Sequence, residues 1–286
     1  MVVISGKGGT GKTVITANFA VLAQNKVIAD CDVDAADLHL LTKPNIEERH
    51  EFKSSRVARI ESELCKKCGK CSAVCRFNAI NGNFSVDSIA CEGCTVCSLI
   101  CPEKAIKMEE ESSGEWFISK TRYGTMVHAR LGAAKENSGK LVTVVRKAAK
   151  EIGEREGADY CIIDGPPGIG CPVIASLAGV DFALIVTEPT LSGLHDLIRV
   201  AHLARQQRVK ISVCINKYDI NLENTEKIKE FCSQSDIDIA GEIPFEKKIV
   251  ESLVRARPFL EHNESTEASR RIKKMWVKIQ DVLHEV

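Results

Sequence analysis

The chain has 286 residues, long enough for one large domain and one small one or for two medium ones. Hydrophobic residues make up 44% and charged residues 27%, an ordinary balance for a soluble globular protein. The formal net charge is zero, so bulk charge predicts no binding to nucleic acid or to an anionic membrane. The apolar runs are too short to span a bilayer, and Met1 leads into "VVISGKGG" without the features of a signal peptide. We therefore expect a cytoplasmic protein.

Short apolar segments alternate with helical segments over most of the chain. Strands are predicted at Val2–Ile4, Val27–Ala29, Trp116–Ile118, "YCIIDG", "FALIVTE", "ISVCINK" and "IAGEIP", and helices at 12–24, 141–155, 191–207 and 222–233. Continuous apolar strands between helices predict an α/β fold of the doubly wound type, with a mainly parallel sheet covered on both faces. Ligands of such sheets bind at the carboxyl ends of the strands.

The segment "GKGGTGKT" follows the first strand and opens the first helix. It fits the phosphate-binding pattern G-x4-G-K-T, in which backbone N–H groups and a helix N-terminus surround phosphate oxygens. Lys12 is expected to contact the β- and γ-phosphates, and Thr13 to hold Mg²⁺. A chance glycine-rich turn is the alternative. The residues expected to bind nucleotide here are Gly6, Lys7, Gly8, Gly9, Thr10, Gly11, Lys12, Thr13 and Val14.

With Lys7, the loop reads K-G-G-T-G-K-T and resembles the deviant Walker A motif of the MinD, ParA and nitrogenase iron protein superfamily. The resemblance implies a P-loop NTPase fold and Mg²⁺-dependent hydrolysis of ATP. In that family the additional lysine reaches the nucleotide phosphates, commonly across a dimer interface. A nucleotide-dependent homodimer is therefore expected.

Other motifs follow in the order of that family. Asp32 in "ADCDVDAADLHL" matches the switch I aspartate that positions the attacking water, and Asp164 in "IIDGPPGIG" matches the switch II residue near Mg²⁺. Lys7, Lys12, Asp32 and Asp164 are thus the expected catalytic residues, although solvated aspartates at strand ends are the alternative. Asn216 and Lys217 in "INKYD" match the base-contacting segment. "NKYD" also fits the guanine-binding pattern N-K-x-D, whereas the deviant loop favours ATP.

Eight of the 13 cysteines lie between Cys65 and Cys101. The segments "CKKCGKCSAVC" and "CEGCTVCSLIC" share the spacing C-x2-C-x2-C-x3-C, and an "AI" pair follows each, which indicates an internal duplication. An odd number of cysteines without a signal peptide argues against a disulfide framework and favours thiolate-bound metal. Zinc is the alternative metal, but its sites usually combine two separated C-x2-C pairs.

The two runs resemble a bacterial ferredoxin with two [4Fe–4S] clusters, in which the fourth cysteine of each run ligates the other cluster. The resemblance implies one cluster on Cys65, Cys68, Cys71 and Cys101, and a second on Cys75, Cys91, Cys94 and Cys97. Pro102 follows the family pattern, whereas Arg76 stands where proline is usual. A small α+β ferredoxin domain is thus expected at 59–109, inserted in an ATPase domain made of 1–58 and 110–286.

Several other residues have less specific interpretations. Cys171 lies seven residues after Asp164, the offset of a cluster-binding cysteine in the nitrogenase iron protein, but residues 110–160 lack the second cysteine that a bridging cluster needs. The segment 269–286 is an amphipathic helix that either packs on the core or docks on a membrane. His128 and His195 have no partner in the sequence. Core packing is expected of the isolated cysteines Cys31, Cys161, Cys214 and Cys232.

The motifs together predict an ATP-hydrolysing iron–sulfur protein that couples a nucleotide-driven conformational change to electron transfer. A nucleotide-switched scaffold or carrier for metal-cofactor assembly is the alternative, with the clusters as structure or cargo. A positioning ATPase on membrane or DNA is a third hypothesis. The expected partner is an unidentified redox or cofactor-assembly protein, and neither nucleic acid nor a membrane is expected.

Overall fold

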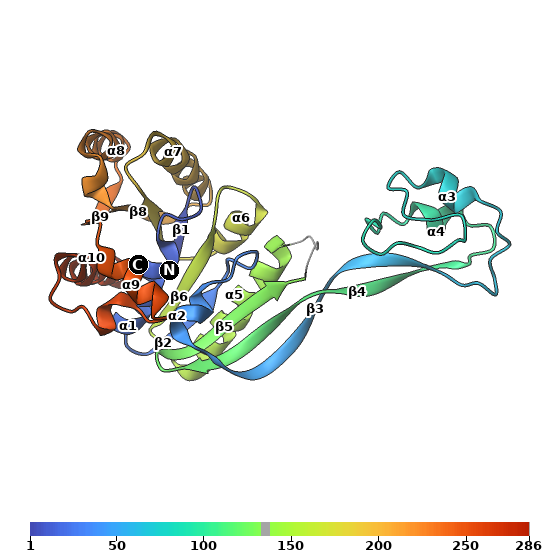
Figure 1. Ribbon diagram of the computed structural model, residues 1–286, viewed down its shortest axis with the longest axis horizontal. Helices are drawn as coiled ribbons and strands as arrows, with labels where there is room; N and C mark the ends of the chain where they lie inside the picture. Colours follow the sequence, from blue (N-terminus) through green and yellow to red (C-terminus); the bar gives the residue numbers. More distant parts are fainter. Residues whose placement is uncertain (133–137, 286) are drawn as a thin grey trace. The chain divides into compact units, whose positions relative to one another are not determined.

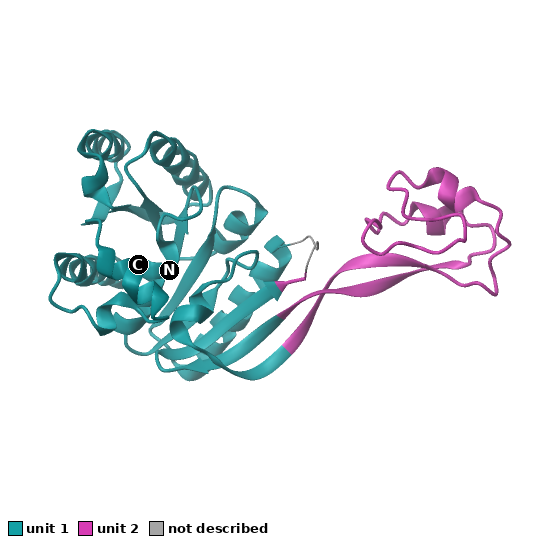
Figure 2. Cartoon of the chain, in the orientation of Figure 1, with its two compact units in different colours: residues 1–49, 116–130, 138–286 teal, residues 50–115, 131–137 magenta. Residues whose placement is uncertain are grey.

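The computed structural model describes residues 1–132 and 138–285 of the chain (Figure 1). It divides into two compact units. The first unit comprises Met1–Arg49, Trp116–Arg130 and Ser138–Val286, and the second comprises His50–Glu115 with a short piece that begins at Leu131 (Figure 2). The second unit thus begins earlier and ends later than 59–109, because the strands on either side of the cysteine runs are long.

The described strands form one sheet in the order β3-β4-β5-β2-β6-β1-β7-β8-β9. Their bounds are β1 Val2–Ser5, β2 Lys26–Asp30, β3 Asn45–Ile60, β4 Ile106–Thr121, β5 Gly124–Leu131, β6 Tyr160–Pro167, β7 Phe182–Thr187, β8 Lys210–Asn216 and β9 Asp238–Ile243. Pairing is parallel between β5, β2, β6, β1, β7, β8 and β9 in turn. The prediction of a mainly parallel α/β sheet is therefore confirmed.

The helices connect and cover these strands. Their bounds are α1 Lys12–Leu22, α2 Leu38–Thr42, α3 Lys70–Val74, α4 Val96–Ile100, α5 Ser138–Glu156, α6 Cys171–Leu177, α7 Leu191–Gln206, α8 Leu222–Gln234, α9 Lys247–Val254 and α10 Glu267–His284, with 3₁₀ turns η1 Tyr218–Ile220 and η2 Phe259–Glu261. Right-handed crossovers place α1, which leads from β1 back to β2, on one face of the sheet. They place α5, α6, α7 and α8, which lead in the opposite direction, on the other face.

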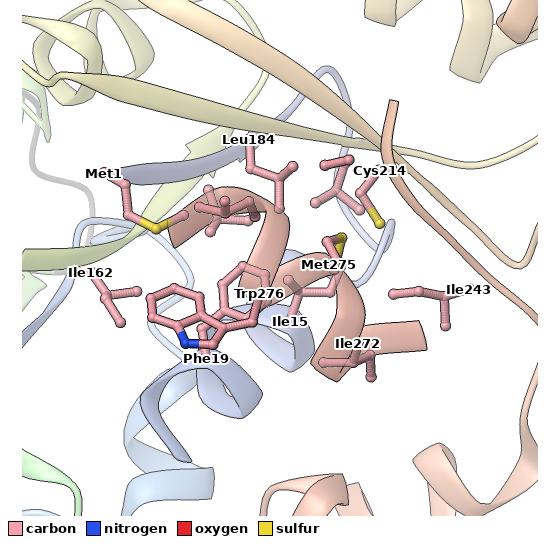
Figure 3. Close-up of a cluster of buried hydrophobic side chains, with 14 of the residues drawn as sticks. Met1, Ile15, Phe19, Ile162, Leu184, Cys214, Ile243, Ile272, Met275 and Trp276 are labelled. Atoms are coloured by element: carbon pink, nitrogen blue, oxygen red, sulfur yellow. The ribbon is translucent and has the colours of Figure 1, made fainter. Parts of the chain in front are cut away.

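The C-terminal helix α10 packs on the core of the first unit (Figure 3). Trp276 lies 5.0 Å from Phe19 of α1 between ring centroids, and Ile272 and Met275 are fully buried. These contacts bury the apolar stripe that sequence analysis found in the segment 269–286. The last residue of that segment, Val286, lies outside the described residues. The stripe therefore faces protein rather than a membrane. Within the described residues, no helix has the length and apolarity needed to cross a bilayer.

Strands β3 and β4 were not predicted at their observed lengths. Both are rich in charged residues, and most residues of β3 are exposed or half-buried, so neither shows the apolar pattern of a core strand. The expected strand at Trp116–Ile118 is the apolar end of β4. Hydrophobicity therefore predicted only the end of β4 that belongs to the first unit.

Candidate functional site

The phosphate-binding loop lies between β1 and α1, at the carboxyl end of the sheet. Gly9 and Gly11 have φ angles of 77° and 98°, in the left-handed region that favours glycine. A Cβ atom at Gly11 would lie 2.5 Å from the amide nitrogen of Asn216, so this position also needs glycine for space. Since Gly11 is the N-cap, no side chain caps α1, and its first N–H groups remain directed toward the loop. The geometry suits an anion.

Lys12 and Asp32 lie close together at this end of the sheet. The Lys12 side chain is buried, and its Nζ atom lies 3.9 Å from Oδ2 of Asp32. Burial raises the pKa of Asp32, and the charge of Lys12 opposes this rise. Asp30 fixes the same segment, because its carboxylate accepts hydrogen bonds from the N–H groups of Asp32 at 3.1 Å and Leu38 at 3.2 Å. The structure therefore brings both predicted residues to one site.

Asp164 lies within the buried part of β6, beside Asp30 in the register of β2 and β6. Its Oδ1 atom accepts a hydrogen bond from Thr16 at 2.9 Å, whereas its buried Oδ2 atom has no partner among the described residues. Burial raises the pKa of Asp164 to about 6, against the opposing effects of Thr13 and Lys12. The unpartnered Oδ2 atom of Asp164 and the hydroxyl of Thr13, which acts on the same carboxylate, are oxygen donors of the kind that Mg²⁺ prefers.

Lys7 is held by residues at the end of β7 and the start of α7. Its Nζ atom lies 2.7 Å from Oε1 of Glu188 and donates hydrogen bonds to Thr190 at 3.2 Å and Ser192 at 3.1 Å. Glu188 also pairs with Lys217, at 3.2 Å. Burial alone would raise the pKa of Glu188, but the hydrogen bonds from Lys7 and Lys217 lower it. Sequence analysis missed Glu188, whose only signal is an acidic residue at the end of a buried strand.

Asn216 supports the phosphate-binding loop. Its amide donates to the carbonyl oxygen of Thr10 at 2.8 Å, and its Oδ1 atom accepts from the N–H of Lys217 at 3.0 Å. The carboxylate of Asp219, the last residue of "NKYD", accepts a hydrogen bond from the N–H of Phe245 at 2.7 Å. Contact of Asn216 and Lys217 with a base stays a prediction. This hydrogen bond gives one oxygen of the Asp219 carboxylate a structural role.

The two cysteine runs of the second unit have the same backbone pattern. In each run, left-handed φ angles occur two residues after the first cysteine, one residue after the second and three residues after the fourth. These positions are Lys67 (53°), Gly69 (77°) and Asn78 (51°) in the first run, and Gly93 (61°), Thr95 (66°) and Lys104 (49°) in the second. Four of the six are not glycine, and threonine is a strained choice here. The duplication seen in sequence is thus also a duplication of backbone conformation.

The cysteines gather in two sets. Cys75, Cys91, Cys94 and Cys97 line one cavity, together with apolar residues such as Val86 and Met108. In the other set, burial raises the pKa of Cys71, and the neighbouring Cys65 and Cys101 raise it further. Among the described residues, no group of three or more His, Cys, Asp or Glu side chains is arranged to hold a single metal ion.

The remaining candidates are less prominent. Cys171 is exposed at the first turn of α6, beside Gly139. Burial lowers the pKa of His128 to about 4, and its ring stacks on Phe117 and hydrogen-bonds to Ser119. His195 is exposed. Three of the isolated cysteines, Cys31, Cys214 and Cys232, are buried as core packing predicts, and Cys161 is partly buried.

Comparison with known proteins agrees with this geometry. The family model of the CobQ/CobB/MinD/ParA nucleotide binding domain matches residues 1–259. An uncharacterised protein of Methanocaldococcus jannaschii is 33% identical over 98% of this chain and 96% of its own length, and a second protein of that organism is 27% identical over 92% and 91%. The septum site-determining protein MinD of Synechocystis is 24% identical over 91% of this chain and 81% of its own.

Solved structures show the same fold. MinD of Pyrococcus horikoshii, in complex with Mg-ADP, superposes with a TM-score of 0.59 at 17% identity, over 99% of this chain and 97% of its own. The cell division ATPase MinD of Pyrococcus furiosus gives 0.57 at 20% identity, over 98% of both chains.

Proposed function

Because the chain belongs to the CobQ/CobB/MinD/ParA nucleotide-binding domain family, we propose that it hydrolyses Mg-ATP at the phosphate-binding loop and couples this reaction to electron transfer through two [4Fe–4S] clusters. The observation that carries the iron–sulfur part is the cavity lined by Cys75, Cys91, Cys94 and Cys97. These four residues are the set that the ferredoxin spacing predicts for one cluster, including the fourth cysteine contributed by the other run.

At the nucleotide site, the chain supplies positive charge, a magnesium position and a candidate base. The loop N–H groups and Lys12 would bind the phosphates, and Thr13 and Asp164 would hold Mg²⁺, whose charge offsets that of the phosphate oxygens. Asp32 would orient the attacking water by accepting its hydrogen bond. The distance of 3.9 Å between Nζ of Lys12 and Oδ2 of Asp32 supports these roles, because one phosphate group could then contact both side chains.

The pairing of Lys7 with Glu188 supports a nucleotide-dependent change. In this structure Lys7 points toward Glu188, Thr190 and Ser192 of its own chain. To reach nucleotide phosphates, in its own subunit or in a second copy, the ammonium group would leave these partners. We infer that the negative charge of ATP competes with Glu188 for Lys7, and that homodimer formation accompanies the exchange.

At the cysteine runs, the backbone fits an anionic cluster. Left-handed residues separated by one residue, such as Lys67 and Gly69, can direct successive N–H groups toward a bound anion, an arrangement found at phosphate loops and at Fe–S sites. The cost of left-handed Lys67 and Thr95 is consistent with a bound group that the conformation serves. A single zinc ion fits the sequence less well, because zinc sites usually combine two separated C-x2-C pairs. When bound, the clusters would supply one-electron transfer.

A scaffold or carrier for metal-cofactor assembly is the second candidate. It is favoured by the exposure of Cys68 and Cys94, one in each set, because an exposed thiolate allows a cluster to be passed to another protein. The two functions differ in whether nucleotide alters the reduction potential or the release of the clusters.

Redox titration distinguishes these functions. The chain is reconstituted with iron and sulfide, about eight irons per monomer being expected for two clusters. Potentials are then measured by EPR with and without ATP in the variant Asp32→Asn, which should bind ATP and hydrolyse it slowly. Coupling of about 1.4 kcal/mol corresponds to a tenfold change in ATP affinity and about 60 mV for one electron. Equal potentials, with ATP-dependent transfer of iron to an apo-ferredoxin, would favour the carrier function.

A further inference from the structure

The two cysteine runs share their backbone conformation but differ in the side chains around them. The first run carries Lys66, Lys67 and Lys70 at the positions where the second run carries Glu92, Gly93 and Val96. We call the segment 65–70, "CKKCGK", the lysine loop. An internal duplication that conserves backbone geometry but changes charge indicates that the two halves meet different surroundings.

The lysine loop presents uncompensated positive charge. Its three lysines are exposed, and the sequence contains no acidic residue from Cys65 to Val86. Among the ion pairs of the described residues, none involves these lysines, whereas the nearby Glu61 pairs with Lys107. Glu63 is exposed two residues before the loop and reduces the net charge without removing it.

The positive charge surrounds a cluster ligand. Cys68, in the middle of the loop, is an exposed cysteine of the set Cys65, Cys68, Cys71 and Cys101. Electron transfer between proteins requires close approach of the two redox centres, and a complementary charge pattern increases the rate of productive encounter. The exposed thiol marks the side from which that approach is shortest.

We propose that the lysine loop is the docking surface for a small acidic electron-carrier protein, which exchanges one electron with the cluster held by Cys65, Cys68, Cys71 and Cys101. This inference rests on the proposed iron–sulfur function. In the forward step, the reduced carrier loses one electron and the oxidised [4Fe–4S]²⁺ cluster gains it to become [4Fe–4S]⁺. No covalent bond or proton is transferred.

The second run is a poor surface for such a carrier. Val96, Leu99 and Ile100 on α4 are apolar and 45%, 83% and 41% exposed, and Glu92 is the only charged residue between Cys91 and Cys101. An acidic protein would therefore distinguish the two ends of the duplicated unit. The difference in charge therefore favours docking of the carrier at the first run.

An acidic protein fits the lysine loop better than a nucleic acid does. Nucleic-acid sites extend over many phosphates, or combine basic residues with aromatic side chains on which bases stack. The lysine loop has three lysines and no aromatic residue, in a chain with zero net charge. A compact patch beside a redox centre suits a partner whose acidic residues also surround a redox centre.

The test measures electron transfer to the full-length reconstituted protein by stopped flow. An acidic plant-type [2Fe–2S] ferredoxin, reduced beforehand, serves as the carrier. The test variant is Lys66→Glu/Lys67→Glu/Lys70→Glu. One control, Lys66→Arg/Lys67→Arg/Lys70→Arg, keeps the charge. The other, Lys247→Glu/Lys248→Glu/Lys274→Glu, makes the same charge change at exposed residues of the first unit.

At low ionic strength we expect the test variant to accept electrons at least tenfold more slowly than the native protein, and both controls to stay within about twofold. The difference should shrink as salt is added. Oxidation of the reduced variant by the cationic hexaamminecobalt(III) should be faster than that of the native protein. Such oxidation shows that the clusters of the variant are intact, so that loss of folding does not imitate the expected result.

Three outcomes would overturn the inference. With about eight irons per monomer and a normal EPR signal, equal rates for native protein and test variant would refute the docking surface and leave the proposed function standing. Lysine-dependent binding of a DNA or RNA oligonucleotide, with transfer from the ferredoxin unaffected, would assign the surface to nucleic acid. Failure of every variant and the native protein to assemble iron would refute both the inference and the proposed function.

Discussion

The nucleotide site and the cysteine unit differ in how far the protein alone forms them. At the nucleotide site, side chains from distant segments already contact one another: Thr16 bonds to Asp164, and Asn216 bonds to Thr10. The hydrophobic cluster beside the cysteines of the second unit contains four buried residues, Ala58, Cys71, Ile80 and Ile106, with half-buried cysteines packed around them. A large core can hold a binding site ready, whereas a small one depends on additional crosslinks.

Because the second unit has the smaller core, we expect removal of the clusters to have the largest effect on its structure. Without iron, we expect the amides of the second unit to exchange as fast as an unfolded peptide, because four ligands per cluster would no longer tie the two runs together. The first unit should keep its protection and its affinity for ATP. Hydrogen exchange with mass-spectrometric readout measures both units at once. The variant Cys97→Ser should reproduce the loss, and unchanged protection in iron-free protein would contradict the comparison.

Substitution of Lys7 and Lys12 tests whether the two loop lysines have different roles, one in hydrolysis and the other in ATP binding. Lys12→Ala should weaken ATP binding about 10- to 100-fold, since a buried charged contact to phosphate is lost. Lys7→Ala should bind ATP within about threefold of the native value, because the contact that Lys7 would gain with ATP replaces its ion pair with Glu188. It should hydrolyse ATP about 100-fold or more slowly, because we propose that the charge of Lys7 mainly stabilises the transition state. Calorimetry and phosphate release provide the two measurements. Full activity of Lys7→Ala would remove that residue from the reaction.

Substitution of Glu188 tests whether its ion pair with Lys7 slows basal ATP hydrolysis. Glu188→Gln keeps the shape of the side chain but loses the ion pairs with Lys7 and Lys217. We expect basal ATP hydrolysis and dimer formation to rise about three- to tenfold, because Lys7 no longer has to leave a carboxylate. Asp159→Asn, near Asn25 at a distance from the nucleotide loop, is a matched control. A rate equal to or below the native rate would show that Glu188 does not restrain Lys7.

The buried carboxylates predict a smaller effect that depends on pH. Asp164 has a pKa of about 6 in the folded chain, whereas an unfolded aspartate titrates near pH 4, so the folded state binds more protons between these values. The free energy of unfolding without nucleotide should therefore contain a contribution that falls as the pH rises from about 4 to 6, by at most about 1.4 kcal/mol per pH unit.

Urea unfolding of the native protein and of Asp164→Asn between pH 4.5 and 6.5 measures this contribution. The variant removes the titration of Asp164. It also removes the negative charge that helps to raise the pKa of Asp30, so the contribution of Asp30 to the pH dependence becomes weaker as well. Identical pH dependence in the two proteins would show that Asp164 is already ionised in the folded state.

Cys171 is expected to give the smallest effect. It is exposed on the first unit, and residues 110–160 contain no cysteine that could serve as the second ligand. Cys171→Ala should therefore leave the iron content at about eight per monomer, as two clusters require. Inductively coupled plasma spectrometry of the reconstituted variant gives this number. A native content of about ten irons per monomer that falls to about eight in the variant would indicate a third cluster shared between two subunits.

Local motifs account for what the sequence by itself determined. The phosphate loop, the apolar strands β1, β6, β7 and β8, and the duplication of the cysteine runs each depend on neighbouring residues, so their spacing and hydrophobicity were sufficient. Strand β3 was missed because its residues remain largely exposed, and without burial there is no apolar pattern to read.

Only the tertiary structure decided which distant residues meet. It brings Glu188 to Lys7, and it joins the amide of Asn216 to the loop carbonyl of Thr10. It also packs the apolar stripe of α10 on Phe19, where the sequence left a membrane surface open as an alternative. The physical reason is that strand order sets these contacts: β1 lies between β6 and β7, with β8 beyond, and no local pattern encodes that arrangement.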